Sequence, residues 1–366
     1  MPGDTGHSAG GHIGWVEGLS PWPEHFGLER MRALLTDLGN PQLRFPSIHV
    51  VGTNGETSTT LMCAALLRSE GLHVGAYVSP HVRGFPERIQ VDGAAVDLER
   101  ALARVRPHAE GATQFEVLTA AAFAEFAAEQ VDAAVVEAGL GGRLDATNVL
   151  GAPVVVLTNV ALEHTDVLGE APEAIAAEKL AVAGAGSIVV LGEHEWEAAA
   201  LAAGASRVEH VSGSNLALAV AAAEAFLGRP VDPRAAESVR VPGRLERRGE
   251  RPLEIWDGAH NLAGIGYLLP RLESRRYVVV ASILGDKDAD GILERLARAG
   301  RILVATRSSN DRSLPAGEVA ARARKWFPTV ETADDPRDAL RLARALGPRV
   351  LVTGSLYLLA DLTNDE

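Results

Sequence analysis

Short runs of apolar residues alternate with longer segments of helical pattern along most of this chain. Nine of these runs are predicted as strands: Ile48–Val51, Val74–Val78, Ala133–Glu137, Val154–Leu157, Ser187–Leu191, Leu253–Trp256, Tyr277–Ser282, Ile302–Ala305 and Val350–Thr353. Six segments between them are predicted as helices: Thr59–Glu70, Leu118–Glu129, Asn215–Leu227, Ala289–Ala299, Pro315–Trp326 and Pro336–Leu346. Continuous apolar strands separated by helices are typical of parallel sheets that are covered on both faces. The sequence therefore predicts an α/β fold.

A break in this alternation falls at Val239–Pro252, which is rich in Pro, Gly and Arg and precedes a new apolar run. The 366 residues are enough for two domains at roughly 150 residues each. We expect a larger N-terminal domain of residues 1–242 and a smaller C-terminal domain of residues 243–366. The polar start of the chain, residues 1–14, is predicted to be disordered.

The charge balance limits the classes of partner. The chain has 35 Lys and Arg against 48 Asp and Glu, so its formal charge is −13. A nucleic-acid partner is not expected, because phosphate neutralisation needs clustered cations. The single cysteine, Cys63, lies in an apolar helical pattern and is expected to be buried, which excludes an intrachain disulfide. No signal-peptide pattern and no apolar run of ~18 residues is present, so we expect a cytoplasmic protein without a membrane partner. A monomer is the default expectation.

The segment IHVVGTNGETSTT has the order strand, glycine-containing turn and helix start that a phosphate-binding loop needs. Gly52 and Gly55 let the backbone approach a phosphate, and the first N–H groups of the helix point towards it. Thr57 and Ser58 offer hydroxyl groups to a magnesium ion. The expected nucleotide-binding residues of this loop are Gly52, Thr53, Asn54, Gly55, Glu56, Thr57 and Ser58.

One residue departs from the P-loop pattern, because Glu56 stands where the pattern has lysine. A carboxylate about 4 Å from a phosphate oxygen costs roughly 4 kcal/mol at an effective dielectric constant near 20, where a lysine would contribute about as much stabilisation. Taken alone, the segment is equally compatible with a strand, turn and helix that bind no nucleotide.

Longer segments are more specific. They are GLERMRALLTDLGNPQLRFPSIHVVGTNG, VSPHVRGFPERIQVDG, VVEAGLGGRLDATNV, TNVALEHTDVLGEAPEAIAAEK, PGRLE, WDGAHN, LGDKD and VTGSLYLLADL. From about Gly27 to Leu362, this ordered set resembles the folylpolyglutamate synthase/dihydrofolate synthase family of the Mur ligase superfamily. The resemblance implies a Mur-ligase-like P-loop domain with a parallel sheet, followed by a smaller Rossmann-like domain.

The same resemblance implies an ATP-dependent amide ligase with magnesium as its metal. In this family the γ-phosphate passes to a folate or pteroate carboxylate, and the amino group of L-glutamate attacks the acyl phosphate. Such catalysis depends mostly on positioning and charge stabilisation. The expected substrates are folate, dihydropteroate as a further acceptor, and L-glutamate.

Several residues of the N-terminal domain match family positions. Glu137 ends an apolar strand, and the carboxyl ends of parallel strands are where ligands bind in such sheets. By resemblance Ser58, Ser79, Glu137 and His164 are metal ligands, and Pro80 and His81 contact substrate. Lys179 matches a lysine that the family carbamylates; the alternative is a surface helix lysine. The glycine-rich stretch 139–148 is by default a structural turn; alternatively Asp145 and Asn148 hold this loop near the phosphates without contacting them.

In the C-terminal domain, Arg244 and Asp257 match residues that contact ATP, the first at a phosphate and the second at the ribose. His260 and Ser355 match positions associated with the incoming amino acid. The expected catalytic residues are Lys179, His164 and His260. Lys287 could also reach the cleft, although a surface turn explains it equally well.

Two alternatives stay open at this point. A catalytically silent relative that binds folate or a partner would account for Glu56 directly. A Mur ligase of cell-wall synthesis would share the fold, but SPHVRGFPERIQVDG resembles the folate branch. The chain between Lys179 and Asn215 is also shorter than in the family, so a small β-element near the nucleotide is expected to be missing.

Overall fold

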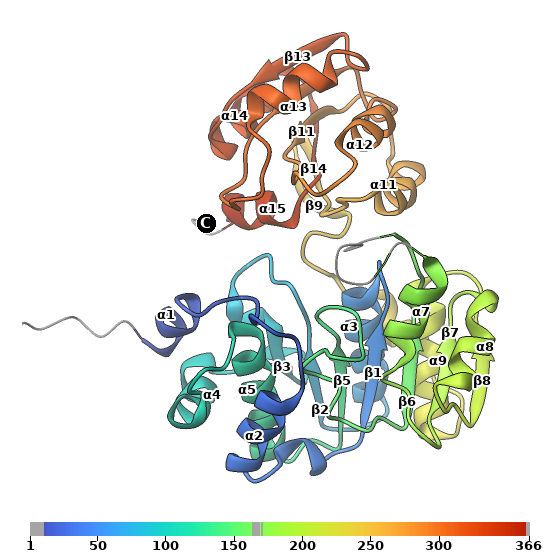
Figure 1. The fold of residues 1–366 in the computed structure, drawn as a ribbon. Coiled ribbons are helices and arrows are strands. Elements are labelled where there is room, and N and C mark those ends of the chain that lie inside the picture. Colours follow the sequence, from blue (N-terminus) through green and yellow to red (C-terminus); the bar gives the residue numbers. More distant parts are fainter. Residues whose placement is uncertain (1–10, 163–168, 170, 364–366) are drawn as a thin grey trace, which may run out of the picture. The chain divides into compact units, whose positions relative to one another are not determined.

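The computed structural model describes residues 11–162, 169 and 171–363. Its contacts divide the chain into two compact units (Figure 1). The N-terminal unit runs up to Ser79 and from Phe85 to Val239, and the C-terminal unit holds Pro80–Gly84 and the chain from Arg240 onward. The later division falls inside the stretch Val239–Pro252. Nothing in the sequence pattern marks Pro80–Gly84 as part of the C-terminal unit.

The N-terminal unit is built on a mixed, mostly parallel sheet. Among the described residues it has eight strands in the order β4-β3-β2-β5-β1-β6-β7-β8. Their bounds are β1 Ser47–Val51, β2 Val74–Tyr77, β3 Ile89–Val91, β4 Ala94–Ala95, β5 Ala133–Glu137, β6 Val154–Leu157, β7 Ile188–Leu191 and β8 Arg207–His210. Strand β1 pairs in parallel with β5 and β6, so the strand that leads into the P-loop lies in the middle of the sheet. Among the described strands of this sheet, only the pairs β2–β3 and β3–β4 are antiparallel.

The C-terminal unit has a second sheet, with six strands among the described residues in the order β13-β12-β11-β14-β10-β9. Their bounds are β9 Glu246–Glu250, β10 Leu253–Trp256, β11 Val278–Ala281, β12 Ile302–Ala305, β13 Thr329–Thr332 and β14 Arg349–Thr353. All pairs are parallel except β9 with β10. The α/β fold with two mostly parallel sheets is therefore confirmed.

Helices cover both faces of each sheet. In the N-terminal unit they are α1 His12–Glu17, α2 Glu29–Asp37, α3 Glu56–Ser69, α4 Leu98–Val105, α5 Gln114–Glu129, α7 Pro172–Leu180, α8 Glu197–Ala202, α9 Asn215–Leu227 and α10 Arg234–Glu237. In the C-terminal unit they are α11 Leu262–Leu268, α12 Ala289–Leu296, α13 Ala316–Ala323, α14 Pro336–Leu346 and α15 Leu356–Thr363. Within the described chain no helix is long and apolar enough to cross a membrane.

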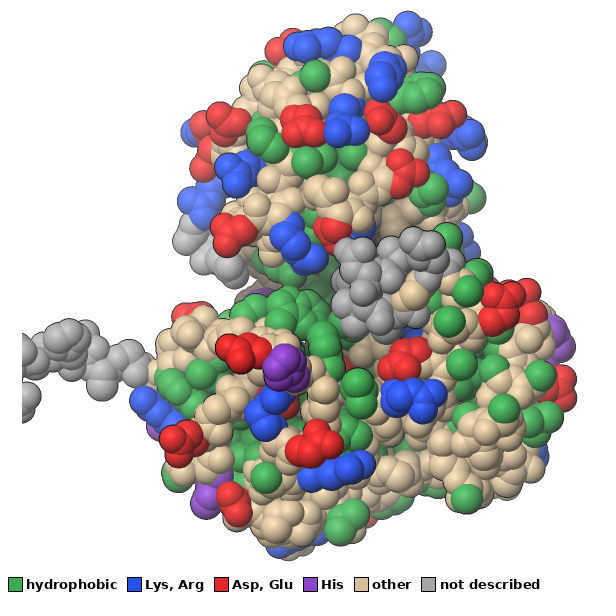
Figure 2. All heavy atoms as spheres, viewed as in Figure 1, with side chains coloured by type: hydrophobic (Ala, Val, Ile, Leu, Met, Phe, Trp, Pro, Cys, Tyr) green, Lys and Arg blue, Asp and Glu red, His purple; other side chains and the backbone are tan. Residues whose placement is uncertain are grey.

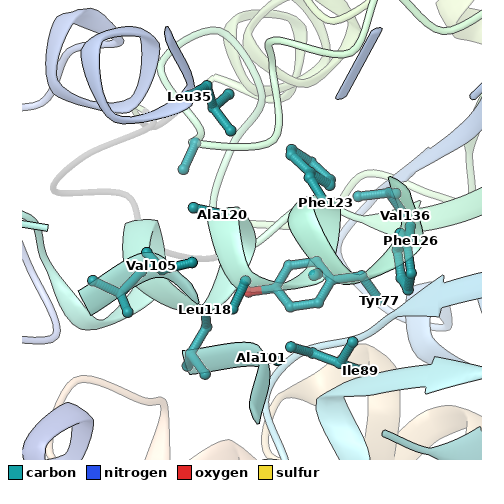
Figure 3. Packing of buried hydrophobic residues seen from close by; sticks show 14 of the residues in the cluster. Leu35, Tyr77, Ile89, Ala101, Val105, Leu118, Ala120, Phe123, Phe126 and Val136 are labelled. Carbon is teal, nitrogen blue, oxygen red and sulfur yellow. The ribbon is translucent and has the colours of Figure 1, made fainter. Parts of the chain in front are cut away.

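Separate apolar clusters fill the two sides of the first sheet. On one side α2, α4 and α5 pack on β2 and β5, and Figure 3 shows Tyr77, Phe123 and Phe126 in this cluster. On the other side α3 and α9 pack on β1, β5 and β6. The free thiol of Cys63 lies buried in this second cluster, as the sequence predicted.

Charged side chains lie at the surface in mixed arrangement. On the face shown in Figure 2, Lys and Arg side chains alternate with Asp and Glu over the C-terminal unit. Most of the ion pairs are exposed, so each contributes on the order of 1 kcal/mol or less to stability. A buried exception is Glu125, which Arg100 and Arg104 neutralise.

Candidate functional site

The parallel register brings four loops to one edge of the first sheet. Val50 of β1 pairs with Glu137, Val51 pairs with Leu157, and Tyr77 of β2 pairs with Val136. The chain after β1, β2, β5 and β6 therefore leaves the sheet at the same level. This edge is where ligands bind in open α/β sheets.

The carboxylate of Glu137 is the centre of this edge. The hydroxyl of Thr57 donates to its Oε1 atom at 2.8 Å, and the backbone N–H of Ser79 donates to its Oε2 atom at 2.9 Å. Glu137 is 4% exposed. One buried carboxylate thus joins the P-loop helix to the chain that follows β2, and three of the residues predicted from the sequence lie together.

The backbone of the P-loop adopts a conformation that requires glycine at Gly55. Gly55 caps α3 with a φ of +96°, in the left-handed region that favours glycine, and an added Cβ would lie 2.6 Å from Oδ1 of Asn215. The loop is held from behind by the chain after β6. Thr53 N donates to Asn159 O at 3.1 Å, and Ala161 N donates to Thr53 Oγ1 at 3.1 Å. The N-terminal end of α3 is therefore fixed at the sheet edge, where its N–H groups can bind an anion.

Glu56 is the first residue of α3. A carboxylate in the first turn of a helix interacts favourably with the helix dipole, typically by 0.3–1 kcal/mol. Local structure therefore accommodates Glu56 well. The conflict that the sequence predicted is with a bound phosphate and not with the fold.

Lys179 is not a surface helix lysine, because it is 5% exposed. Its Nζ atom donates to the carbonyl oxygen of Gly52, so the side chain reaches the P-loop from α7. The glycine-rich stretch packs on the same helix end. An added Cβ at Gly142 would lie 2.5 Å from the carbonyl oxygen of Lys179, which explains a glycine there.

The donor atoms at this edge fit a hard divalent cation. They are the Glu137 carboxylate and the hydroxyls of Thr57, Ser58 and Ser79, all of them oxygen atoms. The described residues contain no cluster of three or more His, Cys, Asp or Glu that could hold a metal. Magnesium usually binds through one or two carboxylates and the phosphates of its substrate, and the Glu137 carboxylate with its neighbouring hydroxyls suits that mode of binding. The predicted ligand His164 lies outside the described residues.

Asp145 organises the glycine-rich stretch. Its Oδ2 atom accepts N–H groups from Gly139 at 2.9 Å and Leu140 at 2.8 Å, and its Oδ1 atom accepts that of Thr147 at 3.0 Å. Burial raises the pKa of Asp145. The Nδ2 group of Asn148 donates to Arg143 O at 2.9 Å. Both side chains thus bond to the backbone of the glycine-rich stretch itself.

Sequence reasoning missed His49, which faces this stretch from the central strand. Its Nε2 atom lies 2.8 Å from Thr147 Oγ1. Burial lowers the pKa of His49 to about 3, so the ring is neutral. A lone histidine between Ile48 and Val50 in an otherwise apolar strand was the one available signal.

The predicted C-terminal residues also gather at a strand end. Asp257 follows β10 and accepts the N–H groups of Leu245 at 2.8 Å and Ala259 at 2.9 Å. Burial raises the pKa of Asp257, although Arg244 nearby opposes this effect. The carbonyl oxygen of Gly258 lies 2.9 Å from Nδ1 of His260, which orients that ring.

Ser355 lies on the neighbouring loop after β14. Gly354 N donates to Ala259 O at 3.0 Å, so the loops of Ser355 and His260 are adjacent. Lys287 is close to buried, with a side chain that is 9% exposed and 3.5 Å from Asp286. Pro80 and His81 belong to this unit, whereas Ser79 belongs to the other. Their roles remain predictions.

Two family models match the chain. The Mur ligase middle domain matches residues 50–213, and the Mur ligase glutamate ligase domain matches residues 243–356. A dihydrofolate synthase/folylpolyglutamate synthase of Mycobacterium tuberculosis is 35% identical, over 89% of this chain and 84% of that protein.

Solved structures agree with these matches. M. tuberculosis folylpolyglutamate synthase complexed with ADP has a TM-score of 0.87 and 32% identity, covering 95% of this chain and 96% of that one. Escherichia coli FolC in complex with DHPP and ADP has a TM-score of 0.86 and 27% identity, covering 98% of both chains. A bifunctional folylpolyglutamate synthase/dihydrofolate synthase with Mn, AMPPNP and L-glutamate bound has a TM-score of 0.85 and 27% identity, again covering 98% of both.

The fold and the two domain matches define a Mur-type glutamate ligase. With relatives at 30% identity and more along nearly its whole length, the chain belongs to the folylpolyglutamate synthase/dihydrofolate synthase family of ATP-dependent glutamate ligases. The comparisons give no support to a catalytically silent protein.

Proposed function

We propose that this chain joins L-glutamate to a folate-type carboxylate in two steps. An oxygen of the acceptor carboxylate attacks the γ-phosphorus of ATP, and ADP leaves. The amino nitrogen of glutamate then attacks the carbonyl carbon of the acyl phosphate, phosphate leaves, and the nitrogen loses a proton. Dihydropteroate is a second acceptor in this proposal, supported by the DHPP-bound relative.

One observation supports this proposal above the others. The Glu137 carboxylate is held between Thr57 of the P-loop helix and Ser79 after β2, and all three lie at the carboxyl edge of the sheet. A buried carboxylate with hydroxyl groups beside a P-loop is the donor set that a phosphoryl-transfer site needs. Magnesium, bound by Glu137, Ser58 and Ser79 together with the nucleotide phosphates, would neutralise charge that develops during transfer.

The remaining residues have proposed roles in binding and orientation. The backbone of Gly52–Gly55 and the first N–H groups of α3 bind the phosphates. Arg244 and Asp257 bind the nucleotide, while His260 and Ser355 bind the incoming glutamate. Pro80 and His81 contact the acceptor, and His164 is a further metal ligand.

The side chain of Lys179 can act in this proposal in either of two chemical forms. As an ammonium group it places a positive charge directly at the P-loop, where it would offset the carboxylate of Glu56. As a carbamate it would instead be an anionic oxygen ligand for the metal, as the family resemblance implies. Intact-protein mass spectrometry with and without bicarbonate distinguishes the forms, because the carbamate adds the mass of carbon dioxide.

The proposal is tested by measuring ATP-dependent addition of glutamate to dihydropteroate and tetrahydrofolate, with magnesium and bicarbonate. Wild type and Glu56→Lys are compared. Product from the wild type supports an active ligase whose P-loop charge comes from another cation. Product from neither protein, with either acceptor, would overturn the proposal.

Glu56→Lys should raise ligase activity more than twofold, because it replaces a repulsive carboxylate beside the phosphates by an attractive ammonium group. Glu195→Lys makes the same charge change at an exposed position and is the control. An increase of no more than twofold, or an equal increase in Glu195→Lys, would contradict our account of the loop.

A further inference from the structure

Three buried polar side chains connect the central strand to the glycine-rich stretch after Glu137. The Nε2 atom of His49 lies 2.8 Å from Thr147 Oγ1, and that hydroxyl donates to Asp145 Oδ1. His49 is 1% exposed, Thr147 is 0% exposed and Asp145 is 6% exposed. Buried polar groups are usually hydrogen-bonded, and each of these three side chains bonds to another member of the set.

The direction of each hydrogen bond follows from the groups present. Asp145 accepts three backbone N–H groups and the Thr147 hydroxyl, so both of its oxygens serve as acceptors. The single hydroxyl hydrogen of Thr147 is used on Asp145. Thr147 Oγ1 must therefore accept from His49, which fixes the neutral imidazole with its hydrogen on Nε2.

The two chain segments that these three residues join both lead directly into the site. Gly52, the first P-loop glycine, is three residues after His49 in the same strand and turn. Gly139, whose N–H is held by Asp145, is two residues after Glu137. Val50 and Glu137 are paired neighbours in β1 and β5. A movement of the chain after Glu137 would therefore alter the hydrogen bonds that its carboxylate accepts from Thr57 and Ser79.

We propose that His49, Thr147 and Asp145 are positioning residues of the ligase: they fix the chain after Glu137 to the central strand, and so hold the Glu137 carboxylate where Thr57 and Ser79 bind it. The assignment of Glu137 as a metal ligand rests on the proposed function. The positioning itself does not, and it can be measured without turnover.

Thr147→Val is the decisive variant, because it removes the hydroxyl at nearly constant volume and breaks both side-chain bonds. Thr60→Val is the matched control. Thr60 is also fully buried, and its hydroxyl has no hydrogen-bond partner among the residues that the structure describes. Thr147→Ser restores the hydroxyl, and His49→Gln keeps an N–H donor where His49→Leu does not.

The first readout is amide hydrogen exchange at Ser79 and Gly139, whose N–H groups bond to Glu137 and Asp145. Thr147→Val should exchange both at least tenfold faster, whereas Thr60→Val and Thr147→Ser stay within twofold of wild type. Exchange that is unchanged at Ser79 in a folded Thr147→Val protein overturns the proposal.

The second readout is binding of Mn²⁺ with a non-hydrolysable ATP analogue. Thr147→Val should weaken it at least tenfold, and in the ligase assay KM for the metal nucleotide should rise more than kcat falls. Unchanged Mn²⁺ affinity together with faster Ser79 exchange would contradict the metal role of Glu137 but leave the positioning intact. The two proposals can therefore fail separately.

If Thr147→Val does not fold, the proposal is tested on the wild-type protein by NMR. ¹⁵N NMR of His49 should show a neutral ring with its hydrogen on Nε2, unchanged between about pH 5.5 and 8.5, since burial holds its pKa far below that range. An imidazolium signal, or the hydrogen on Nδ1, would exclude the bonding order that the proposal requires.

Discussion

At the scale of single residues, burial decides what the candidate groups can do. Glu137 and Lys179 are both nearly inaccessible, at 4% and 5% exposure, and both contact the P-loop region. Charged groups are rarely buried unless they are paired or functional. The burial of these two charged side chains beside the P-loop, at the carboxyl ends of the strands, indicates a functional site.

Glu137→Gln tests the central carboxylate. The amide keeps the size of the side chain but removes the charge that a divalent cation needs, so ligase activity should fall by about 100-fold or more. Glu195→Gln, at an exposed position, should change activity less than twofold. Retention of half the activity in Glu137→Gln would show that this carboxylate is not a metal ligand.

The pH dependence of stability should include a contribution from His73. Its hydrogen bond to Asp92 raises the pKa of His73 above the ordinary 6.5. A group whose pKa is higher in the folded state stabilises it fully below the unfolded pKa and loses this contribution as pH rises through the folded value. The free energy of unfolding should therefore decrease slightly above pH 6.5, and His73→Asn should flatten that slope in urea titrations. A wild type and variant with the same slope would exclude this contribution.

At the scale of secondary-structure elements, close backbone approach fixes the glycine-rich stretch. Gly142→Ala would place a methyl group 2.5 Å from a backbone oxygen of α7 that cannot rotate away. We expect a loss of about 1–3 kcal/mol in the free energy of unfolding, measured by urea denaturation. Gly184→Ala, where an added Cβ meets nothing within 4 Å, is the control. Equal stability of the two variants would contradict the close contact.

Helix α5 begins with a reciprocal cap. Thr113 accepts the N–H of Glu116 at 3.3 Å, and the Glu116 carboxylate accepts the N–H of Thr113 at 2.8 Å. Thr113→Ala should cost about 1 kcal/mol, and Thr113→Ser should restore most of it. If alanine and serine are equally stable, the cap contributes nothing.

At the scale of the whole molecule, the sequence predicted what depends on long apolar patterns. All nine predicted strands exist, because buried parallel strands are apolar on both faces. Five described strands were not predicted. Strands β8, β9 and β13 have the polar sequences RVEH, ERRGE and TVET and form sheet edges, and β3 and β4 are only three and two residues long. β9 even lies inside the stretch that sequence reasoning treated as a boundary.

Contacts between segments that are distant in the sequence could not be predicted from the apolar pattern. Nothing local to Lys179 shows that its ammonium group reaches Gly52, and nothing local to His49 shows that it faces Thr147. These pairs are far apart in sequence and meet only because the sheet register aligns β1 with its neighbours. The candidate site residues came from the resemblance to the family, whereas the hydrogen bonds between them could be read only from the structure.

The segment Pro80–Gly84 has a consequence for how such enzymes can be divided. Val82 is buried in the apolar cluster of the C-terminal unit that also contains Trp256, and Arg83 pairs with Glu246 at 2.8 Å. The chain therefore passes between the two units three times, after Ser79, after Gly84 and after Val239. A C-terminal fragment made by one cut near residue 240 would lack Val82 from this apolar cluster and Arg83 from its pair with Glu246. An exchange of the C-terminal unit between two relatives would therefore have to include Pro80–Gly84 as well as the chain from Arg240 onward.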